Sequence, residues 1–193
     1  MRQRAPGTLR IVGGEWRSRL IHFDTACELR PTPDRVRQTL FDWLAPDIAG
    51  LRGLDLYAGS GALGFEALSR GAATVTFVER DARQVRRLQE AARALGAEDR
   101  ARILHGDALG HLASGAPGER YEIAFLDPPY AADALNAALV LLAPRLAAFN
   151  RLYLEWPRNR PQALPAGFRL LREKQAGQVS YGLATYSFSG SSQ

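Results

Sequence analysis

The chain has 193 residues, of which 46% are hydrophobic and 23% charged, values typical of a soluble globular protein with one domain. No apolar run approaches the ~20 residues of a membrane helix, and the N-terminal sequence MRQRAPGTLR lacks the apolar core of a signal peptide, so we expect a cytoplasmic protein that does not contact a membrane. Cys27 is the only cysteine and the three histidines are not spaced as metal ligands, which excludes an internal disulfide and predicts no metal site.

Most of the net charge of +5 lies near the N-terminus. Residues 1–40 contain eight arginines and only four acidic residues. A basic segment beside a nearly neutral body favours a polyanionic partner such as a nucleic acid. A solvated, arginine-rich surface would have the same composition, so charge alone does not decide between the two interpretations.

The first elements in chain order predict a small extension. Thr8–Val12 and Trp16–Phe23 are strand-like runs connected through Gly13-Gly14, which predicts a β-hairpin. Thr32 is then predicted to cap a helix whose first residue is Pro33 and which continues through DRVRQTLFDWL. The apolar residues of this helix fall on one face, so we expect the helix to pack against the rest of the protein.

From Leu54 onward, short apolar strands alternate with helical stretches, which predicts a doubly wound, mostly parallel α/β sheet. The last two of its seven strands, connected through Gly177, are expected to form an antiparallel hairpin at the sheet edge. The predicted strands are 54–57, 75–79, 103–105, 123–127, 152–155, 168–174 and 180–188, with helices near 62–70, 82–95, 107–114 and 133–147. We expect residues 1–32 to form the basic hairpin extension, 33–188 the main domain and 189–193 a flexible tail.

A glycine-rich motif directly follows the first predicted strand of the sheet. The run LDLYAGSGALG contains G-x-G-x-x-G between that strand and a helix. In this pattern Gly59 permits a tight turn, Gly61 lets the backbone approach a ligand, and Gly64 lets the helix pack closely. Glu79 ends the next strand, where its carboxylate can accept both hydroxyls of a ribose. The context favours a nucleoside-containing cofactor over a simple strand-to-helix turn.

Two further acidic residues favour S-adenosylmethionine over a dinucleotide. Asp55 lies just before the glycine loop, where its charge disfavours a pyrophosphate and suits the cationic end of S-adenosylmethionine. Asp107 follows the third strand of the alternation and can accept a hydrogen bond from an adenine amino group. Asp107 can also cap the helix that follows it, and the two roles are compatible.

Asp127-Pro128-Pro129-Tyr130 stands at the end of the fourth strand of the alternation, where open α/β sheets bind ligands. The two prolines remove two N–H donors, so the turn offers only acceptors. The Asp127 carboxylate and the Pro128 carbonyl can each accept one hydrogen of an exocyclic base amine, which is otherwise a poor nucleophile, and hold its nitrogen in line with a sulfonium. Tyr130 offers a flat face for the base. The alternative is a rigid turn with a surface tyrosine.

Together, LDLYAGSGALG, FVERD and FLDPPY resemble the class I S-adenosylmethionine-dependent methyltransferases that modify amino nitrogens. RIVGGEWRSRLI, LRPTPDRVRQTLFDWL and LEWP narrow the resemblance to the bacterial 16S rRNA guanine-N2 methyltransferase family (guanine-966 type), over about Leu9 to Phe188. The resemblance implies transfer of a methyl group from S-adenosylmethionine to a guanine N2 amine of 16S rRNA, with S-adenosylhomocysteine as product. Residues 33–188 would be the methyltransferase domain.

The resemblance also implies roles for individual residues. The cofactor would contact Asp55, Tyr57, Gly59, Ser60, Gly61, Gly64, Glu79, Arg80, Asp107 and Ala108. The target guanine would be held by Asp127, Pro128, Pro129 and Tyr130. The RNA-facing N-terminal region would include Arg10, Arg17, Arg19, Arg30 and Thr32. We expect a monomer that acts on 16S rRNA within a 30S ribosomal subunit or an assembly intermediate.

Three other functions stay open on the sequence alone. A DNA adenine-N6 or cytosine-N4 methyltransferase would share the acceptor turn and the cofactor, but such enzymes usually carry a larger target-recognition region. A nicotinamide-dependent dehydrogenase would need hydride-transfer residues and a larger substrate domain, and neither is evident. A non-catalytic RNA-binding module would not need the intact turn at residues 127–130.

Overall fold

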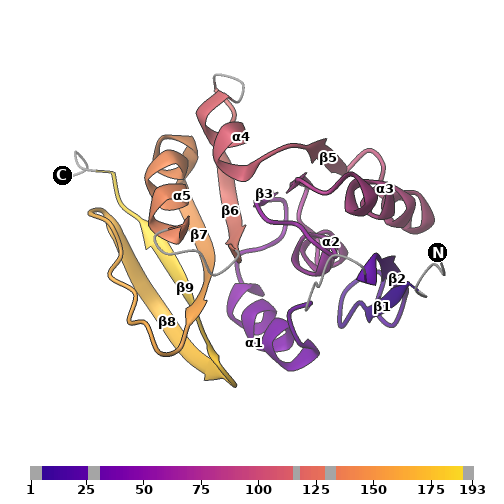
Figure 1. Ribbon diagram of the computed structural model, residues 1–193, viewed down its shortest axis with the longest axis horizontal. Helices are drawn as coiled ribbons and strands as arrows, with labels where there is room; N and C mark the ends of the chain where they lie inside the picture. The colour runs from indigo at the N-terminus through magenta and orange to yellow at the C-terminus, as the bar shows by residue number, and fades with distance from the viewer. Residues whose placement is uncertain (1–5, 26–30, 115–117, 129–133, 189–193) are drawn as a thin grey trace.

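The computed structural model describes residues 6–25, 31–114, 118–128 and 134–188. Its central sheet consists of β3 (Arg52–Asp55), β4 (Thr74–Glu79), β5 (Ala101–His105), β6 (Tyr121–Leu126), β7 (Leu146–Pro157), β8 (Phe168–Ala176) and β9 (Val179–Tyr186). The strand order is β5-β4-β3-β6-β7-β9-β8 (Figure 1). The first five strands in this order run parallel, and β9 runs antiparallel to both of its neighbours. The predicted fold class, a mostly parallel sheet with a C-terminal antiparallel hairpin, is confirmed.

Helices cover both faces of this sheet, and the buried apolar side chains divide into two cores. The helices are α1 (Asp34–Leu44), α2 (Ala62–Ser69), α3 (Ala82–Leu95), α4 (Ala108–Ser114) and α5 (Ala134–Leu142). The core beneath α1, α2 and α3 includes Phe77 and Phe125, whereas the core beneath α4 and α5 includes Leu54 and Leu126. Because both faces are covered, the central strands are apolar on both sides. Within the ranges that the structure describes, no helix is long and apolar enough to cross a membrane.

Two predicted elements are shorter in the structure. The helix predicted near 133–147 ends at Leu142, and a 3-10 turn, η2 (Ala143–Arg145), leads into β7. Pro144 lies in that turn, and a proline cannot continue the hydrogen-bond ladder because it has no amide hydrogen. The strand predicted over Trp16–Phe23 is wrong in its first half: Trp16 is buried and its backbone turns, with Ser18 at a φ of 70°.

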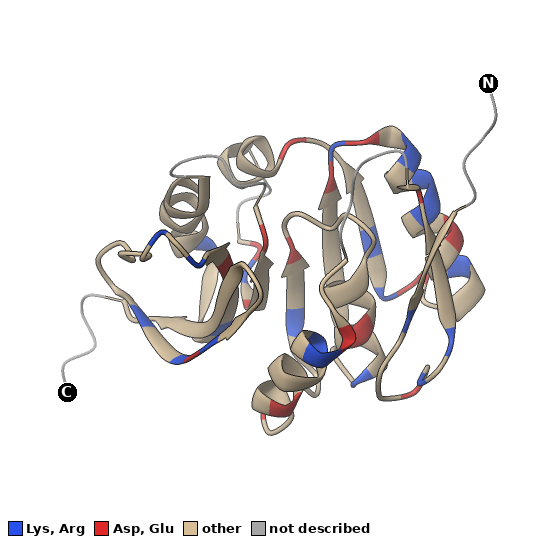
Figure 2. Ribbon diagram, turned by 60° about the horizontal axis from the view of Figure 1, so that its bottom comes forward, with Lys and Arg blue, Asp and Glu red and all other residues tan. Residues whose placement is uncertain are grey.

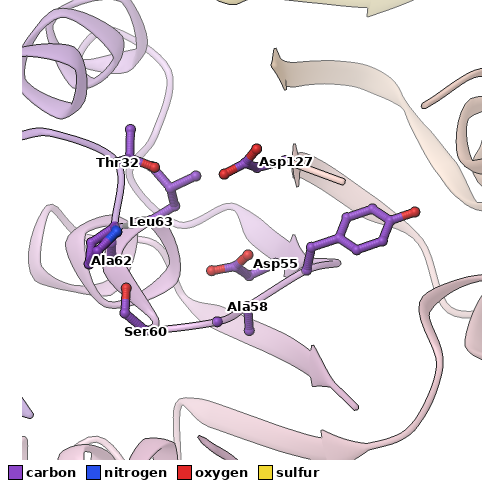
Figure 3. Close-up of a pocket in the computed structure, with 10 residues that line it drawn as sticks. Thr32, Asp55, Ala58, Ser60, Ala62, Leu63 and Asp127 are labelled. Carbon is purple, nitrogen blue, oxygen red and sulfur yellow. The ribbon is translucent and has the colours of Figure 1, made fainter. Parts of the chain in front are cut away.

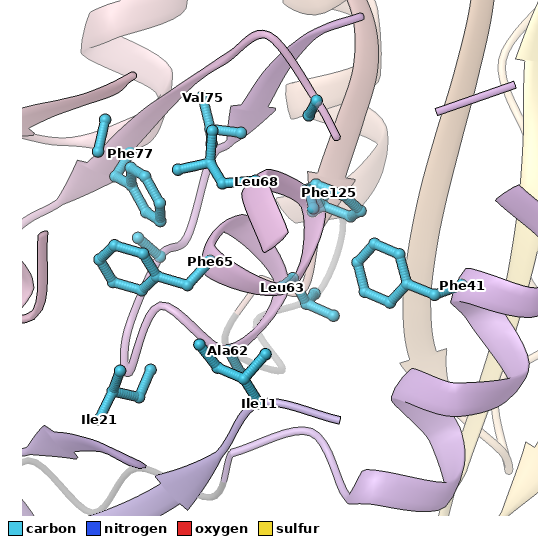
Figure 4. Close-up of a cluster of buried hydrophobic side chains, with 14 of the residues drawn as sticks. Ile11, Ile21, Phe41, Ala62, Leu63, Phe65, Leu68, Val75, Phe77 and Phe125 are labelled. Atoms are coloured by element: carbon cyan, nitrogen blue, oxygen red, sulfur yellow. The ribbon is translucent and has the colours of Figure 1, made fainter. Parts of the chain in front are cut away.

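The N-terminal hairpin packs firmly against the main domain. Its strands are β1 (Gly7–Arg10) and β2 (Leu20–Phe23). Ile11 and Ile21 belong to the same apolar cluster as Phe65 of α2 (Figure 4). Gly14 has a φ of 79°, and a Cβ there would lie 1.9 Å from the carbonyl oxygen of Ser69. Only glycine therefore fits where the hairpin connection meets the end of α2.

Helix α1 begins differently from the prediction. Its N-cap is Pro33, and no side chain caps it. The amides of Val36 and Arg37 donate instead to the Pro33 carbonyl, at 2.9 and 3.0 Å. Thr32, the predicted cap, is buried, and its hydroxyl lies 3.5 Å from Oε1 of Glu155 on β7. The capping role of Thr32 was therefore wrong, because a distant carboxylate takes up the hydroxyl.

Candidate active site

A pocket of about 440 Å³, open to solvent, lies at the carboxyl ends of β3 and β6 (Figure 3). Ligands of open α/β sheets bind at this end of the strands. Three segments form the walls: the residues before α1, the loop from β3 to α2, and the residue that follows β6. The lining residues are Pro31, Thr32, Asp55, Tyr57, Ala58, Gly59, Ser60, Ala62, Leu63 and Asp127.

Glycines shape the β3–α2 loop. Gly59 has a φ of 49° and Gly61 a φ of 77°, both in the left-handed region, and Gly61 is the N-cap of α2. A Cβ on Gly64 would lie 2.2 Å from the Phe77 ring, so this glycine lets α2 pack closely on β4. A Cβ on Gly61 would meet the Phe65 ring at 2.6 Å. Gly61 is therefore required both by the turn and by the closeness of the Phe65 ring.

Two side chains hold this loop in place from the neighbouring strand and helix. The Glu79 carboxylate accepts from the Gly59 amide at 2.8 Å and from the Asp81 amide at 2.7 Å. Gln84 is buried and donates to the Gly59 carbonyl at 3.1 Å. The acid predicted to bind a ribose thus lies at the loop backbone. Gln84 was not predicted, because one glutamine in a polar helix gives no signal of its own.

Two acidic side chains face the same pocket from adjacent strands (Figure 3). Asp55 is buried, accepts from the Gly64 amide at 3.0 Å, and has a pKa of about 7, raised mainly by burial and then by Glu79. Asp127 has a pKa of about 8, raised by burial and then by Glu155 and Asp55. Among the described residues, no ion pair involves either carboxylate. The described part of the pocket therefore brings two acids together without a cation.

A third acid stands beside this pair. Leu126 pairs with Leu154 across β6 and β7, so Asp127 and Glu155 are the next residues on adjoining strands. The Tyr153 hydroxyl donates to Oε1 of Glu155 at 2.6 Å, and burial raises the pKa of Glu155. Neither Tyr153 nor Glu155 was predicted as a site residue. A usable signal existed, because Glu155 is a polar residue at the end of an apolar strand, as Glu79 is.

The predicted adenine contacts lie around the end of β5. Asp107 accepts from the Gly110 amide at 2.9 Å and so caps α4, one of its two expected roles. Tyr57 lines the pocket, and its pKa is raised by burial and by the nearby Asp107. Ala108 is buried, whereas Arg80 is exposed. Contact of Asp107 and Ala108 with an adenine stays a prediction, as does contact of Tyr57 and Arg80 with the cofactor.

The remaining predicted residues are divided between two regions. Arg10, Arg17 and Arg19 are exposed on the N-terminal extension, and the Arg19 guanidinium donates to the Ala94 carbonyl. Thr32, predicted to lie in the RNA-facing region, is a wall of the pocket. Pro128 is buried beside Asp127. Arg30, Pro129 and Tyr130 lie outside the described residues.

Comparison with known proteins finds similarity along nearly the whole chain. The family model described as conserved hypothetical protein 95 matches residues 9–185. Ribosomal RNA small subunit methyltransferase D of Escherichia coli strain K12 is 43% identical over 180 residues, which are 92% of this chain and 89% of that protein. The protein of the same name from Haemophilus influenzae is 38% identical over 182 residues, 93% of this chain and 94% of that protein.

Solved structures give the same result. A putative methyltransferase, yhhF from Escherichia coli, superimposes with a TM-score of 0.84 at 41% identity, covering 94% of this chain and 99% of that one. The putative methylase HI0767 from Haemophilus influenzae superimposes with a TM-score of 0.81 at 35% identity, covering 94% and 100%. This chain is thus similar to these two proteins in length, in fold and in sequence.

Proposed function

The chain belongs to the family described as conserved hypothetical protein 95, and from this membership we propose that it transfers a methyl group from S-adenosylmethionine to the N2 amine of a guanine in 16S rRNA. The relatives named ribosomal RNA small subunit methyltransferase D align with about nine-tenths of the chain. The observation that carries the proposal is the pair of carboxyls, Asp55 and Asp127, that share one pocket to which no described residue contributes a cation.

The donor set of the pocket fits S-adenosylmethionine. This cofactor supplies an electrophilic methyl group on a positively charged sulfur, together with an ammonium group. Positive charge in the pocket would offset the repulsion between Asp55 and Asp127 and lower the pKa of both. Glu79 would accept the ribose hydroxyls while it keeps its bond to the Gly59 amide, so that loop and ribose are positioned together. Asp107 and Tyr57 would contact the adenine.

Asp127 would act directly on the base. Its carboxylate and the Pro128 carbonyl would each accept one hydrogen of the guanine amine, which leaves the nitrogen lone pair free to attack. The cofactor would supply the methyl group as an electrophile, and the Asp127 carboxylate would take the proton that the guanine nitrogen loses. Its raised pKa makes this carboxylate a stronger proton acceptor than an ordinary aspartate, once the positive charge of the cofactor has favoured its ionised form. Tyr130 would stack on the base, and Pro129 would fix the turn.

A methyl-transfer assay with product analysis tests the proposal. Purified protein and labelled S-adenosylmethionine are incubated with 16S rRNA and, separately, with DNA, and the methylated nucleoside is identified by mass spectrometry. The expected product is N2-methylguanosine from rRNA, and Asp127→Ala is expected to abolish its formation. N6-methyladenine or N4-methylcytosine in DNA would instead support a DNA methyltransferase. Binding of NAD in preference to S-adenosylhomocysteine would contradict the cofactor assignment.

We also propose that the enzyme acts as a monomer on an assembled particle rather than on free RNA. A guanine N2 in a duplex lies in the minor groove, so the base must be unpaired or flipped to enter the pocket. A chain of 193 residues has little surface for reading sequence, and the shape of a ribosomal particle can supply the missing selectivity. Equal methylation rates for naked 16S rRNA and 30S particles would contradict this part of the proposal.

A further inference from the structure

A second group of cations occupies the C-terminal part of the chain. Residues 156–193 contain one acidic residue, Glu173, whereas residues 41–155 contain more acidic than basic residues. The basic N-terminal extension is therefore one of two basic ends around an acidic middle. The exposed cations of this part are Arg158, Arg160, Arg169, Arg172 and Lys174. The C-terminal cationic group is defined here as four of them, Arg158, Arg160, Arg172 and Lys174, and leaves out Arg169 at the start of β8.

The C-terminal cationic group lies next to the pocket. Arg158 follows the last residue of β7, three positions after Glu155, and its amide donates to the Gln178 carbonyl in the β8–β9 turn at 2.8 Å. The Lys174 ammonium lies 5.8 Å from the centre of the Trp43 ring. Trp43 stacks on Tyr181, which pairs with Glu155 across β9 and β7. Arg158 and Lys174 thus lie near the carboxyl end of β7, the strand end that carries Glu155.

The two basic ends lie on opposite sides of the pocket. The N-terminal hairpin packs on α2 and α3, toward the β5 edge of the sheet, whereas the C-terminal cationic group is on β8 and the connection before it, at the other edge. Figure 2 shows blue cationic segments toward both ends of the molecule. The pocket lies between them, at β3 and β6.

The four side chains form no ion pair with any residue that the structure describes. At the amino ends of the strands, in contrast, Arg52 pairs with Glu122 and Arg102 with Glu119. Cations on an edge strand also discourage pairing with another sheet. That role would account for the two cations on β8, but not for Arg158 and Arg160, which lie in a connection.

We propose that the C-terminal cationic group binds phosphates of the substrate RNA, so that the RNA backbone is held on both sides of the pocket. This inference rests on the proposed function, because it takes the polyanion to be rRNA. Exposed guanidinium groups without an acidic partner are suited to phosphates, and each such contact adds to the salt dependence of binding. Backbone contacts on both sides would fix the orientation of the RNA over the acids without reading its sequence.

Two variants with the same total charge test the inference. The first combines Arg158→Gln, Arg160→Gln and Arg172→Gln. The bond from Arg158 to Gln178 uses the backbone amide and is kept. The control combines glutamine at three arginines at the amino ends of the strands, the end of the sheet away from the pocket. These control positions are Arg52, Arg102 and Arg120. Full-length proteins are titrated with a 16S rRNA transcript at several salt concentrations.

The first variant is expected to bind the transcript on the order of tenfold or more weakly and to lower the slope of log affinity against log salt by about 2. The control is expected to bind like the parent protein. Equal loss in both variants, or no loss in the first, would overturn the inference. So would weaker binding to 30S particles with unchanged binding to the naked transcript, since that result would indicate a protein partner. Binding of S-adenosylhomocysteine should be unchanged in both variants.

Failure of the proposed function would be distinguishable from failure of this inference. If the parent protein binds the transcript but methylates neither the transcript nor 30S particles, the proposed function fails while the binding comparison still stands. If the parent protein methylates the transcript and the first variant has an unchanged KM for RNA, the proposed function stands and the inference fails.

Discussion

Two regions of the protein bury ionised groups, and they do so in opposite ways. Arg37 is fully buried, and its guanidinium donates to Glu66 at 3.2 Å, to Asp34 at 2.6 Å and to the Arg10 carbonyl at 2.7 Å. Glu66 in turn accepts from Arg70 at 2.8 Å. Every charge in this cluster therefore has a partner of the opposite sign. The pocket, in contrast, brings together Asp55 and Asp127, with Glu155 beside Asp127, and no described residue contributes a cation to it.

The difference separates a structural cluster from a binding site. Buried charges of both signs with satisfied hydrogen bonds can hold segments together, and this cluster joins the N-terminal extension, α1 and α2. Buried charges of one sign oppose folding, and such groups with shifted pKa values concentrate at functional sites. The two regions meet at Thr32, whose carbonyl accepts from Arg37 while its hydroxyl faces Glu155. The cluster of Arg37 and Glu66 thus holds Thr32, one wall of the pocket, in place.

The largest expected effect is a loss of activity without a loss of stability, produced by a substitution in the pocket. Asp127→Asn keeps the size of the side chain but removes its charge and its ability to accept a proton. We expect methyl transfer to fall by about 10²–10⁴-fold, the usual range for a positioned general base. The same change should leave the protein without cofactor at least as stable as the parent at pH 8, because it removes a repulsive charge. Turnover assays and urea unfolding measure the two quantities, and unchanged turnover would remove Asp127 from the mechanism.

In the cluster of Arg37 and Glu66 we expect the opposite, a substitution that lowers stability. Arg37→Met removes one of the two cations that pair with the buried Glu66, and such breaks of buried pairs typically cost about 3–5 kcal/mol. Arg35→Met, at an exposed position of the same helix, is the matched control and should cost far less. The measurement is the free energy of unfolding in urea. A loss no larger than that of the control would contradict the assignment of this cluster as the structural one.

The pH dependence of stability should reveal the unpaired acids. Burial raises the pKa of Asp55 to about 7 and that of Asp127 to about 8, whereas both would be near 3.8 in the unfolded chain. The stability that their protonated forms contribute is therefore fully present below about pH 4, and it is lost as the pH rises through 7 to 8. Over this pH range, the free energy of unfolding should fall by a few kcal/mol more in the parent than in the double variant Asp55→Asn/Asp127→Asn. A difference of one pKa unit corresponds to about 1.4 kcal/mol.

Unfolding at pH 5 and at pH 8 measures this difference. The parent should lose more stability than the double variant between the two pH values, and saturating S-adenosylhomocysteine, which carries an ammonium group, should reduce the loss. A parent that gains stability over this range relative to the double variant would show that the acids are compensated in the folded protein.

The smallest expected effect concerns Glu155, which lies beside Asp127 and raises its pKa. Asp55 is the other acid that acts on Asp127, and Tyr153 donates to Glu155. In Glu155→Gln the pKa of Asp127 should fall, so the midpoint of the pH–rate profile should move to lower pH with a several-fold lower maximum. Tyr153→Phe, which keeps the acid, should not move the midpoint to lower pH. A purely structural Glu155 would lower the rate without moving the midpoint.

Sequence patterns predicted the sheet and placed Asp55 and Asp127 each at the end of a parallel strand. The structure adds that the two strands are neighbours, so both side chains face one pocket. The position of Glu155 depended on the register between β6 and β7, which no local pattern encodes. Thr32 preceded a helix and suggested a cap, but its partner lies 123 positions away in the chain. The C-terminal cations were not predicted either, since two lie in a connection and two among the residues of a strand.

The close contact at Gly14 has a consequence for substrate choice. With its connection pressed against the end of α2, the N-terminal extension has no room to swing, so the separation between its arginines and the pocket is constant. On the proposed function, an RNA can react only if a phosphate and an accessible guanine already stand that far apart. The protein would then recognise a distance in a folded particle, and Gly14→Ala should alter which substrate is accepted before it alters the chemistry.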